Sequence, residues 1–261
     1  MISGRRGVCG LLALGGFLIP QRVLCADLPE LILRAKPSVA LVGTYAATDS
    51  PRFTFRGSGF VVGRGNHLIT NVHVLPDPAQ VGGSAERSLM VQVRRADASW
   101  SERAATVVAL DRTHDLALLR FEGAAAPALK LDAAVAREGL DIAIMGFPVG
   151  GALGFSTVTH RGILASVTPI ALPPAGARDL NPRAIRQLRS GSFDIYQLDL
   201  VAYPGNSGGP LLDLQTGAVI GVINMVLVKG SKETALSAPT GISYAIPALH
   251  ATQLLSEHQD D

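Results

Sequence analysis

The chain has 261 residues, 48% of them hydrophobic and 17% charged, so it can bury the core of one large domain or of two smaller ones. Its formal net charge is +2, but Arg5, Arg6 and Arg22 lie in the first 26 residues, which contain no acid. The remaining body has 20 basic and 21 acidic residues, a net charge of −1. A near-neutral body without a run of lysines or arginines excludes the usual basic nucleic-acid surface, and we expect no nucleic-acid partner.

Residues 1–26 have the organisation of a secretory signal peptide. Two arginines precede an apolar stretch from Val8 to Ile19, and Leu24 to Ala26 supply a candidate cleavage region. The apolar stretch is short for a membrane span, so we predict a periplasmic or secreted protein, with an uncleaved membrane anchor as the alternative. Both cysteines, Cys9 and Cys25, belong to this segment, so we expect no disulfide in the mature body.

The body after residue 26 is predicted to be all-β. Its glycines and prolines separate many short runs of Val, Ile and Leu, and long amphipathic helical patterns are almost absent. The proline-containing segment 124–129 is the candidate boundary, which gives a signal peptide at 1–26 and domains at 27–125 and 126–261. Short helices are expected at 27–36 and 247–258. Strands are expected at 38–45, 57–62, 67–74, 89–93, 104–111, 115–121, 141–146, 157–166, 193–200, 211–212, 218–223 and 242–246, with a long loop at 172–191.

The segment from Tyr203 to Pro210 is a glycine-rich turn around a single serine, Ser207. Its glycines allow backbone conformations that direct several N–H groups toward one point beside the hydroxyl. A nucleophilic serine needs such donors in place, because an oxyanion develops in the transition state. When the turn is considered alone, an ordinary hairpin loop is the alternative.

A serine alcohol needs a base to take its proton, and histidine suits this task near neutral pH. A carboxylate commonly orients the imidazole. His73 and Asp115 supply these groups at predicted strand ends, with Asp111 as an alternative carboxylate. The order His, Asp, Ser differs from that of the α/β-hydrolases and of subtilisin. We expect His114 to face solvent, because adjacent strand residues point to opposite faces.

Three motifs carry a family resemblance, and they are Leu68 to Val74, Asp115 to Leu119 and Gly205 to Pro210. They resemble the histidine, aspartate and serine motifs of the chymotrypsin-like (trypsin-like) serine proteases, and most of all those of the bacterial HtrA/Deg branch. The resemblance covers roughly residues 37 to 247. Val72 replaces the alanine usual before the histidine, and we expect no PDZ domain after Pro247.

The resemblance implies an all-β fold of two six-stranded antiparallel β-barrels with a C-terminal helix and the active site between the barrels. It implies His73, Asp115 and Ser207 as the catalytic residues. It also implies an oxyanion hole at Gly205, Asn206 and Ser207, in which the first and last of these supply backbone N–H groups.

The same resemblance implies a substrate pocket without an acidic wall. Asp199 is the acid nearest to it, and we expect a structural hydrogen-bonding role for this residue. No metal-ligand spacing is present, so we expect neither a metal nor a cofactor. The substrate-binding residues implied are Val201, Ala202, Ile223, Asn224, Tyr244 and Ala245.

We therefore predict a serine endopeptidase that acts on proteins or peptides in extracytoplasmic quality control or processing. Two other classes of function remain open from the sequence. One is a protease-fold binding or scaffold protein without turnover, and the other is a chaperone-like binder of unfolded chains that also cleaves them. The intact triad argues against the first.

Overall fold

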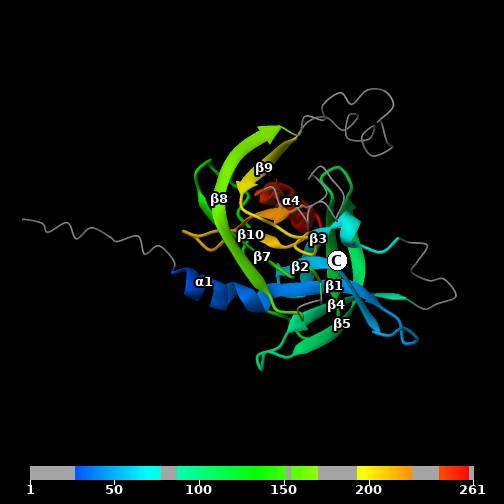
Figure 1. Ribbon diagram of the computed structural model, residues 1–261. Coiled ribbons are helices and arrows are strands. Elements are labelled where there is room, and N and C mark those ends of the chain that lie inside the picture. The colour runs from blue at the N-terminus through cyan, green and yellow to red at the C-terminus, as the bar shows by residue number, and fades with distance from the viewer. Residues whose placement is uncertain (1–26, 78–86, 151–153, 170–192, 225–240, 259–261) are drawn as a thin grey trace, which may run out of the picture.

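The computed structural model describes residues 27–77, 87–150, 154–169, 193–224 and 241–258. The predicted signal peptide and the whole of the predicted loop at 172–191 lie outside the described residues. The described residues form two closed β-barrels that lie side by side (Figure 1). The all-β prediction of two six-stranded antiparallel barrels is confirmed.

The first barrel has the strand order β1-β2-β3-β6-β5-β4, and every neighbouring pair is antiparallel. Its strands are β1 Val39–Tyr45, β2 Phe53–Val62, β3 His67–Asn71, β4 Ser88–Arg94, β5 Trp100–Asp111 and β6 Leu116–Phe121.

The second barrel repeats the same design with the order β10-β11-β12-β9-β8-β7, and its long strand β8 curves around one side (Figure 1). The predicted boundary at 125/126 falls between the last strand of one barrel and the first of the other, and it stays a prediction. The strands are β7 Asp141–Gly146, β8 Val158–Pro169, β9 Asp194–Asp199, β10 Pro210–Asp213, β11 Val219–Ile223 and β12 Ile242–Pro247.

The two barrels share a hydrophobic core. One cluster of buried side chains joins Leu41, Phe60 and Leu118 of the first barrel to Met145 and Val222 of the second. Two further clusters lie one in each barrel. Strands β3 and β11 are buried throughout because they face a barrel interior on one side and other parts of the molecule on the other.

Two helices cover the barrels. Helix α1, Leu28–Ala35, has Pro29 in its first turn and packs Leu31 with Ala143 and Leu214 of the second barrel. Helix α4, Ala248–Ser256, buries Ala251, Leu254 and Leu255 in the shared core. Within the described part of the chain, neither helix has the length and apolar character that crossing a bilayer requires.

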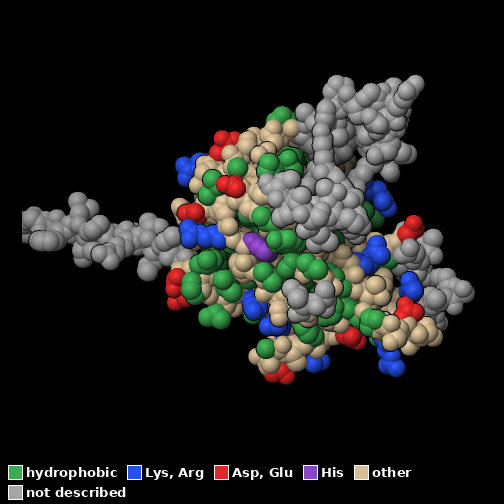
Figure 2. Space-filling view, in the orientation of Figure 1, with side chains coloured by type: hydrophobic (Ala, Val, Ile, Leu, Met, Phe, Trp, Pro, Cys, Tyr) green, Lys and Arg blue, Asp and Glu red, His purple; other side chains and the backbone are tan. Residues whose placement is uncertain are grey.

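Charged side chains are mixed over the surface. Figure 2 shows Lys and Arg interspersed with Asp and Glu on the face in view. This distribution agrees with the near-neutral composition of the body, and it gives this face no extended field of one sign.

The local structure around His73 differs from the prediction. The sequence favours a continuous strand through this residue, but β3 ends at Asn71 and His73 lies in a short 3-10 turn, Val72–Val74. The Arg56 guanidinium on β2 donates from Nε to the Val74 carbonyl oxygen at 2.7 Å and from Nη2 to that of Leu75 at 2.9 Å. These long-range bonds satisfy carbonyls at the end of the turn, and a local sequence pattern does not reveal them.

The shared core predicts a contrast between two leucines. Leu118 is fully buried and belongs to this core, whereas Leu33 on α1 is 73% exposed. Leu118→Ala should lower the free energy of unfolding by about 2–5 kcal/mol, because it removes buried methyl groups and leaves a cavity. Leu33→Ala, the matched control, should change it by less than about 0.5 kcal/mol. Urea denaturation measures both, and equal losses would contradict the shared core.

Candidate active site

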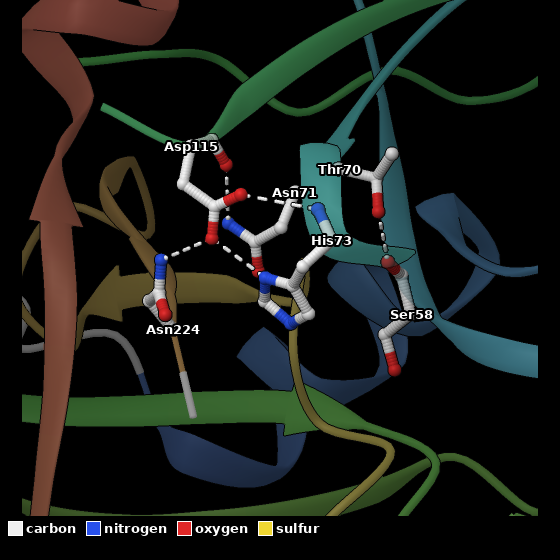
Figure 3. A network of polar contacts seen from close by, with 6 residues as sticks. All are labelled: Ser58, Thr70, Asn71, His73, Asp115 and Asn224. Carbon is white, nitrogen blue, oxygen red and sulfur yellow. Dashed lines mark hydrogen bonds and ion pairs between the residues drawn. The ribbon is translucent and has the colours of Figure 1, made fainter. Parts of the chain in front are cut away.

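The Asp115 carboxylate is the centre of a polar network between the barrels (Figure 3). Its Oδ1 accepts a hydrogen bond from the backbone N–H of His73 at 3.0 Å, and its Oδ2 lies 2.6 Å from His73 Nδ1. The Asp115 side chain is only 13% exposed and that of His73 22%. A carboxylate that is so enclosed needs hydrogen-bond donors around it. The two contacts with His73 supply such donors and fix the orientation of both side chains.

This geometry selects one tautomer of the neutral imidazole. An ionised carboxylate only accepts hydrogen bonds, so the Nδ1 of His73 that faces Asp115 carries a hydrogen. In the neutral ring, Nε2 then carries the free lone pair and can accept a proton. The arrangement can therefore act as a general base oriented by a carboxylate.

Asn224, just beyond β11, brings a donor from the second barrel. Its Nδ2 donates to Asp115 Oδ2 at 2.9 Å, and the residue is 1% exposed. The sequence assigns Asn224 to the substrate pocket, but the structure directs its amide at the carboxylate (Figure 3). No local pattern signals this role, because the two residues are 109 positions apart.

The backbone of Asp115 is held as tightly as its side chain. Asp115 has a positive φ of 58° at the end of a turn before β6, a conformation that Asp tolerates better than most residues. Its carbonyl oxygen accepts hydrogen bonds from Asn71 Nδ2 at 3.0 Å and from the Val72 backbone N–H at 3.1 Å. The two segments that bear His73 and Asp115 are thus joined by backbone and side-chain bonds alike.

Ser207 lies where the serine turn meets the first barrel. Its carbonyl oxygen accepts a hydrogen bond from the Ser58 backbone N–H at 2.9 Å. A Cβ placed on Gly57 would lie 2.7 Å from Val74 Cγ2 and 3.1 Å from the Ser207 carbonyl oxygen. The segment after His73 and the backbone of Ser207 therefore converge on the same glycine, so the structure brings the predicted site residues into one region.

The glycine that follows the serine has no room for a side chain. Gly208 has a φ of +83°, and a Cβ there would overlap the carbonyl oxygen of Ser58. Its N–H donates to the Ile223 carbonyl oxygen at 2.9 Å. The backbone N–H of Asn206 donates to the Tyr203 carbonyl oxygen at 3.0 Å. Among the three residues assigned to the oxyanion hole, Asn206 therefore has a backbone donor that is already used within the turn.

The residues predicted to line the substrate pocket differ in exposure. Ala202, Ile223 and Ala245 are buried, while Val201 and Tyr244 are half-buried. Asp199 is exposed, because it alternates on β9 with the buried Leu198 and precedes the buried Leu200. It pairs with Ile163 and Ile242 on the neighbouring strands, and the described residues give its side chain no hydrogen bond to support the expected structural role.

A second Asp–His pair lies beside the first. Asp111, the alternative orienter, does not reach His73 but lies with its Oδ2 2.5 Å from Nδ1 of His114. His114 stacks on His250 of α4 with ring centroids 3.6 Å apart, and its ring makes a T-shaped contact with that of Phe193. The expectation that His114 faces solvent is wrong, because this residue lies in a turn where strand alternation does not apply.

The environment of this cluster shifts two pKa values. Burial lowers the pKa of His250, and the nearby His114 lowers it further, outweighing the opposite effects of Asp111 and Gln253. Burial alone would raise the pKa of Asp111, but hydrogen bonds from the His114 side chain and backbone overcome this, and the pKa lies below its usual value. The cluster therefore favours a neutral His250 beside an ionised Asp111.

Comparison with known proteins agrees with this architecture. Residues 57–222 match the model of the trypsin-like peptidase domain, and the chain belongs to this family. It is 28% identical over 203 residues to a probable periplasmic serine endoprotease DegP-like of Chlamydia pneumoniae, covering 77% of this chain and 34% of that protein. It is 29% identical over 206 residues to human serine protease HTRA3, covering 78% of this chain and 38% of that protein.

A solved structure shows the same fold. The crystal structure of Deg5 matches with a TM-score of 0.61 and 24% identity, covering 86% of this chain and 90% of that one. The chain spans little more than a third of the length of the curated relatives named above. Within the described ranges, no group of three or more His, Cys, Asp or Glu side chains is arranged to hold a metal ion.

The lowered pKa of His250 predicts a dependence of stability on pH. The unfolded state binds a proton more readily than the folded state, so the stability that neutral His250 contributes is present above its unfolded-state pKa of about 6.5. It is lost as the pH falls through the lower folded-state value. The urea midpoint should therefore decrease as the pH is lowered from about 7.5 to about 5.5. The decrease should be smaller in His250→Gln.

His160 is the control for this prediction, because burial lowers its pKa as well and it lies outside the cluster. His160→Gln should remove a separate part of the pH dependence, and the two changes should add. The account of the cluster would be contradicted if His250→Gln left the slope of the wild-type protein intact.

Proposed function

We propose that this chain is an extracytoplasmic serine endopeptidase in which Ser207 is the nucleophile, His73 the general base and Asp115 the residue that orients it. The observation that carries the proposal is the 2.6 Å contact between Asp115 Oδ2 and His73 Nδ1, which leaves Nε2 as the basic nitrogen. Membership of the trypsin-like peptidase family supports the same assignment.

The reaction follows from these roles. The Ser207 hydroxyl attacks the carbonyl carbon of a peptide bond while His73 Nε2 takes its proton, and a tetrahedral intermediate forms. His73 then gives the proton to the leaving amine, the C–N bond breaks and an acyl-enzyme remains. Water, deprotonated by the same histidine, then attacks the ester carbonyl, the C–O bond to Ser207 breaks, and His73 returns the proton to the serine oxygen as the acid product leaves. Backbone N–H groups of Gly205 and Ser207 stabilise the oxyanion in both steps.

The location and the substrates extend the proposal. The signal-like segment at 1–26 and relatives named as periplasmic support export from the cytoplasm, and we propose a periplasmic or secreted enzyme. Protein or peptide chains are the substrates, in quality control or processing, as the named activities of the relatives suggest.

The assignment of the triad predicts a pattern of non-additive losses. Ser207→Ala should lower kcat on casein by at least about 10⁴-fold, because the nucleophile is removed, and His73→Ala should do similar damage. The double variant should be little worse than either single variant, because the residues act as a unit. Near-ultraviolet circular dichroism should stay unchanged, and losses that multiply would reject the assignment.

The pocket residues predict cleavage after small or medium apolar side chains. None of Val201, Ala202 or Tyr244 carries a negative charge, so a buried ammonium or guanidinium would lose hydration without gaining a partner. An apolar side chain gains about 0.8 kcal/mol for each buried CH₂. Mass spectrometry of a digested peptide library gives the preference directly.

Asp199→Asn is the matched variant for this prediction. Because Asp199 is exposed on the outer side of β9, the change should leave the cleavage profile as it is in the wild-type enzyme. A dominant cut after Arg or Lys that disappears in Asp199→Asn would show that this carboxylate enters the pocket after all.

A further inference from the structure

Ser58 on β2 makes a side-chain bridge between the two barrels. Its side chain is fully buried. The hydroxyl donates to the Gly205 carbonyl oxygen at 2.6 Å and accepts a hydrogen bond from the Phe147 backbone N–H at 3.1 Å. A single hydroxyl of the first barrel thus holds two segments of the second, and one of them is the turn that precedes Ser207.

That turn has a defined conformation. The Asn206 N–H donates to the Tyr203 carbonyl oxygen at 3.0 Å, Pro204 occupies the second position and Gly205 has a φ of +104° at the third. These are the features of a type II turn, in which the third residue is normally glycine. The Pro204 carbonyl accepts from the Val149 N–H at 2.8 Å.

The hydrogen bond from Val149 to the Pro204 carbonyl also sets the direction of the Gly205 N–H. In a trans peptide the C=O and N–H point in opposite directions, so the Gly205 N–H is directed away from Val149. This N–H is one of the two donors proposed for the oxyanion hole. The N–H lies in the peptide plane between Pro204 and Gly205. The peptide plane on the other side of Gly205 limits how far that plane can rotate, because the two planes meet at the Gly205 Cα.

Glycine itself does not fix these planes. Because Gly205 lacks a Cβ, it can adopt other backbone conformations at little cost, and contacts from outside the turn must select one. The plane between Pro204 and Gly205 is held by Val149. The plane between Gly205 and Asn206 is held by Tyr203 at its N–H and by Ser58 at its carbonyl.

The Ser58 hydroxyl is itself held in place by its strand. The Ser58 carbonyl oxygen accepts a hydrogen bond from Thr70 Oγ1 at 2.7 Å, and its N–H donates to Ser207. Figure 3 shows the Ser58 hydroxyl directed away from Thr70. The donor that meets Gly205 is thus part of a rigid sheet.

We propose that Ser58 is a positioning residue for the oxyanion hole: its hydroxyl holds the Gly205 carbonyl and thereby keeps the Gly205 N–H directed at the developing oxyanion before substrate binds. This inference rests on the proposed peptidase function. The first barrel, which bears His73 and Asp115, would then also help to shape the proposed oxyanion hole in the second barrel.

A positioning role and a purely structural role change different kinetic constants. Loss of the hydroxyl leaves the Gly205 carbonyl and the Phe147 N–H without this partner, so the turn can rotate. The oxyanion is present only in the transition state, so kcat should fall while KM is kept. A general loss of folded protein would instead lower the number of active sites.

The experiment compares Ser58→Ala with Ser101→Ala, on peptide hydrolysis by active-site-titrated enzyme. Ser101 is the matched control, a buried serine of the same barrel whose hydroxyl accepts a hydrogen bond from Arg103 Nε on its own strand. We expect Ser58→Ala to lower kcat by about 10–100-fold, less than the roughly 10²–10³-fold loss on removal of an oxyanion-hole donor itself. KM should stay within about twofold.

A peptide aldehyde supplies the second readout, because its adduct with Ser207 bears an oxyanion. Its affinity should fall by the same factor as kcat in Ser58→Ala and stay unchanged in Ser101→Ala. Should Ser58→Ala not fold, Ser58→Cys decides the matter. Its thiol is only a weak donor, so kcat should be at least about threefold below wild type.

Wild-type kcat and aldehyde affinity in the folded Ser58 variant would overturn the inference, as would a loss confined to KM. Failure of the proposed function gives a different result, since the wild-type enzyme would then hydrolyse no peptide. An active wild-type enzyme with an unaffected Ser58 variant rejects the positioning role alone.

Discussion

The structure depends on satisfying the hydrogen-bonding needs of one carboxylate, that of Asp115, in a largely enclosed site. Removing such a charge from water is costly unless hydrogen-bond donors replace the lost hydration. The donors are His73, which contributes its ring and its backbone N–H, and Asn224. Because Asn224 comes from the second barrel, the carboxylate keeps this hydrogen bond only when the two barrels are correctly placed against each other.

The barrels support each other in both directions. Asn224 of the second barrel reaches the carboxylate that orients the histidine of the first. Ser58 of the first barrel reaches the carbonyl of Gly205 in the serine turn of the second. These two bonds, together with the shared hydrophobic core, link the proposed base and the proposed oxyanion hole across the two barrels.

The sequence predicts most of the architecture because its signals are local. Apolar runs between glycines and prolines place nearly every strand, and the three motifs around His73, Asp115 and Ser207 identify the fold. The features it does not predict depend on contacts between distant residues. The 3-10 turn at His73 is stabilised by Arg56, and the roles of Asn224 and Ser58 exist only once the barrels meet.

The most direct test of the central claim is covalent labelling with a fluorophosphonate probe, followed by mass spectrometry of the digested protein. Such a probe reacts with a serine only when a base activates its hydroxyl. The account predicts one label, on the peptide that contains Ser207, and strong loss of labelling in His73→Ala. An unlabelled wild-type protein, or labelling of Ser207 that persists unchanged in His73→Ala, would contradict it.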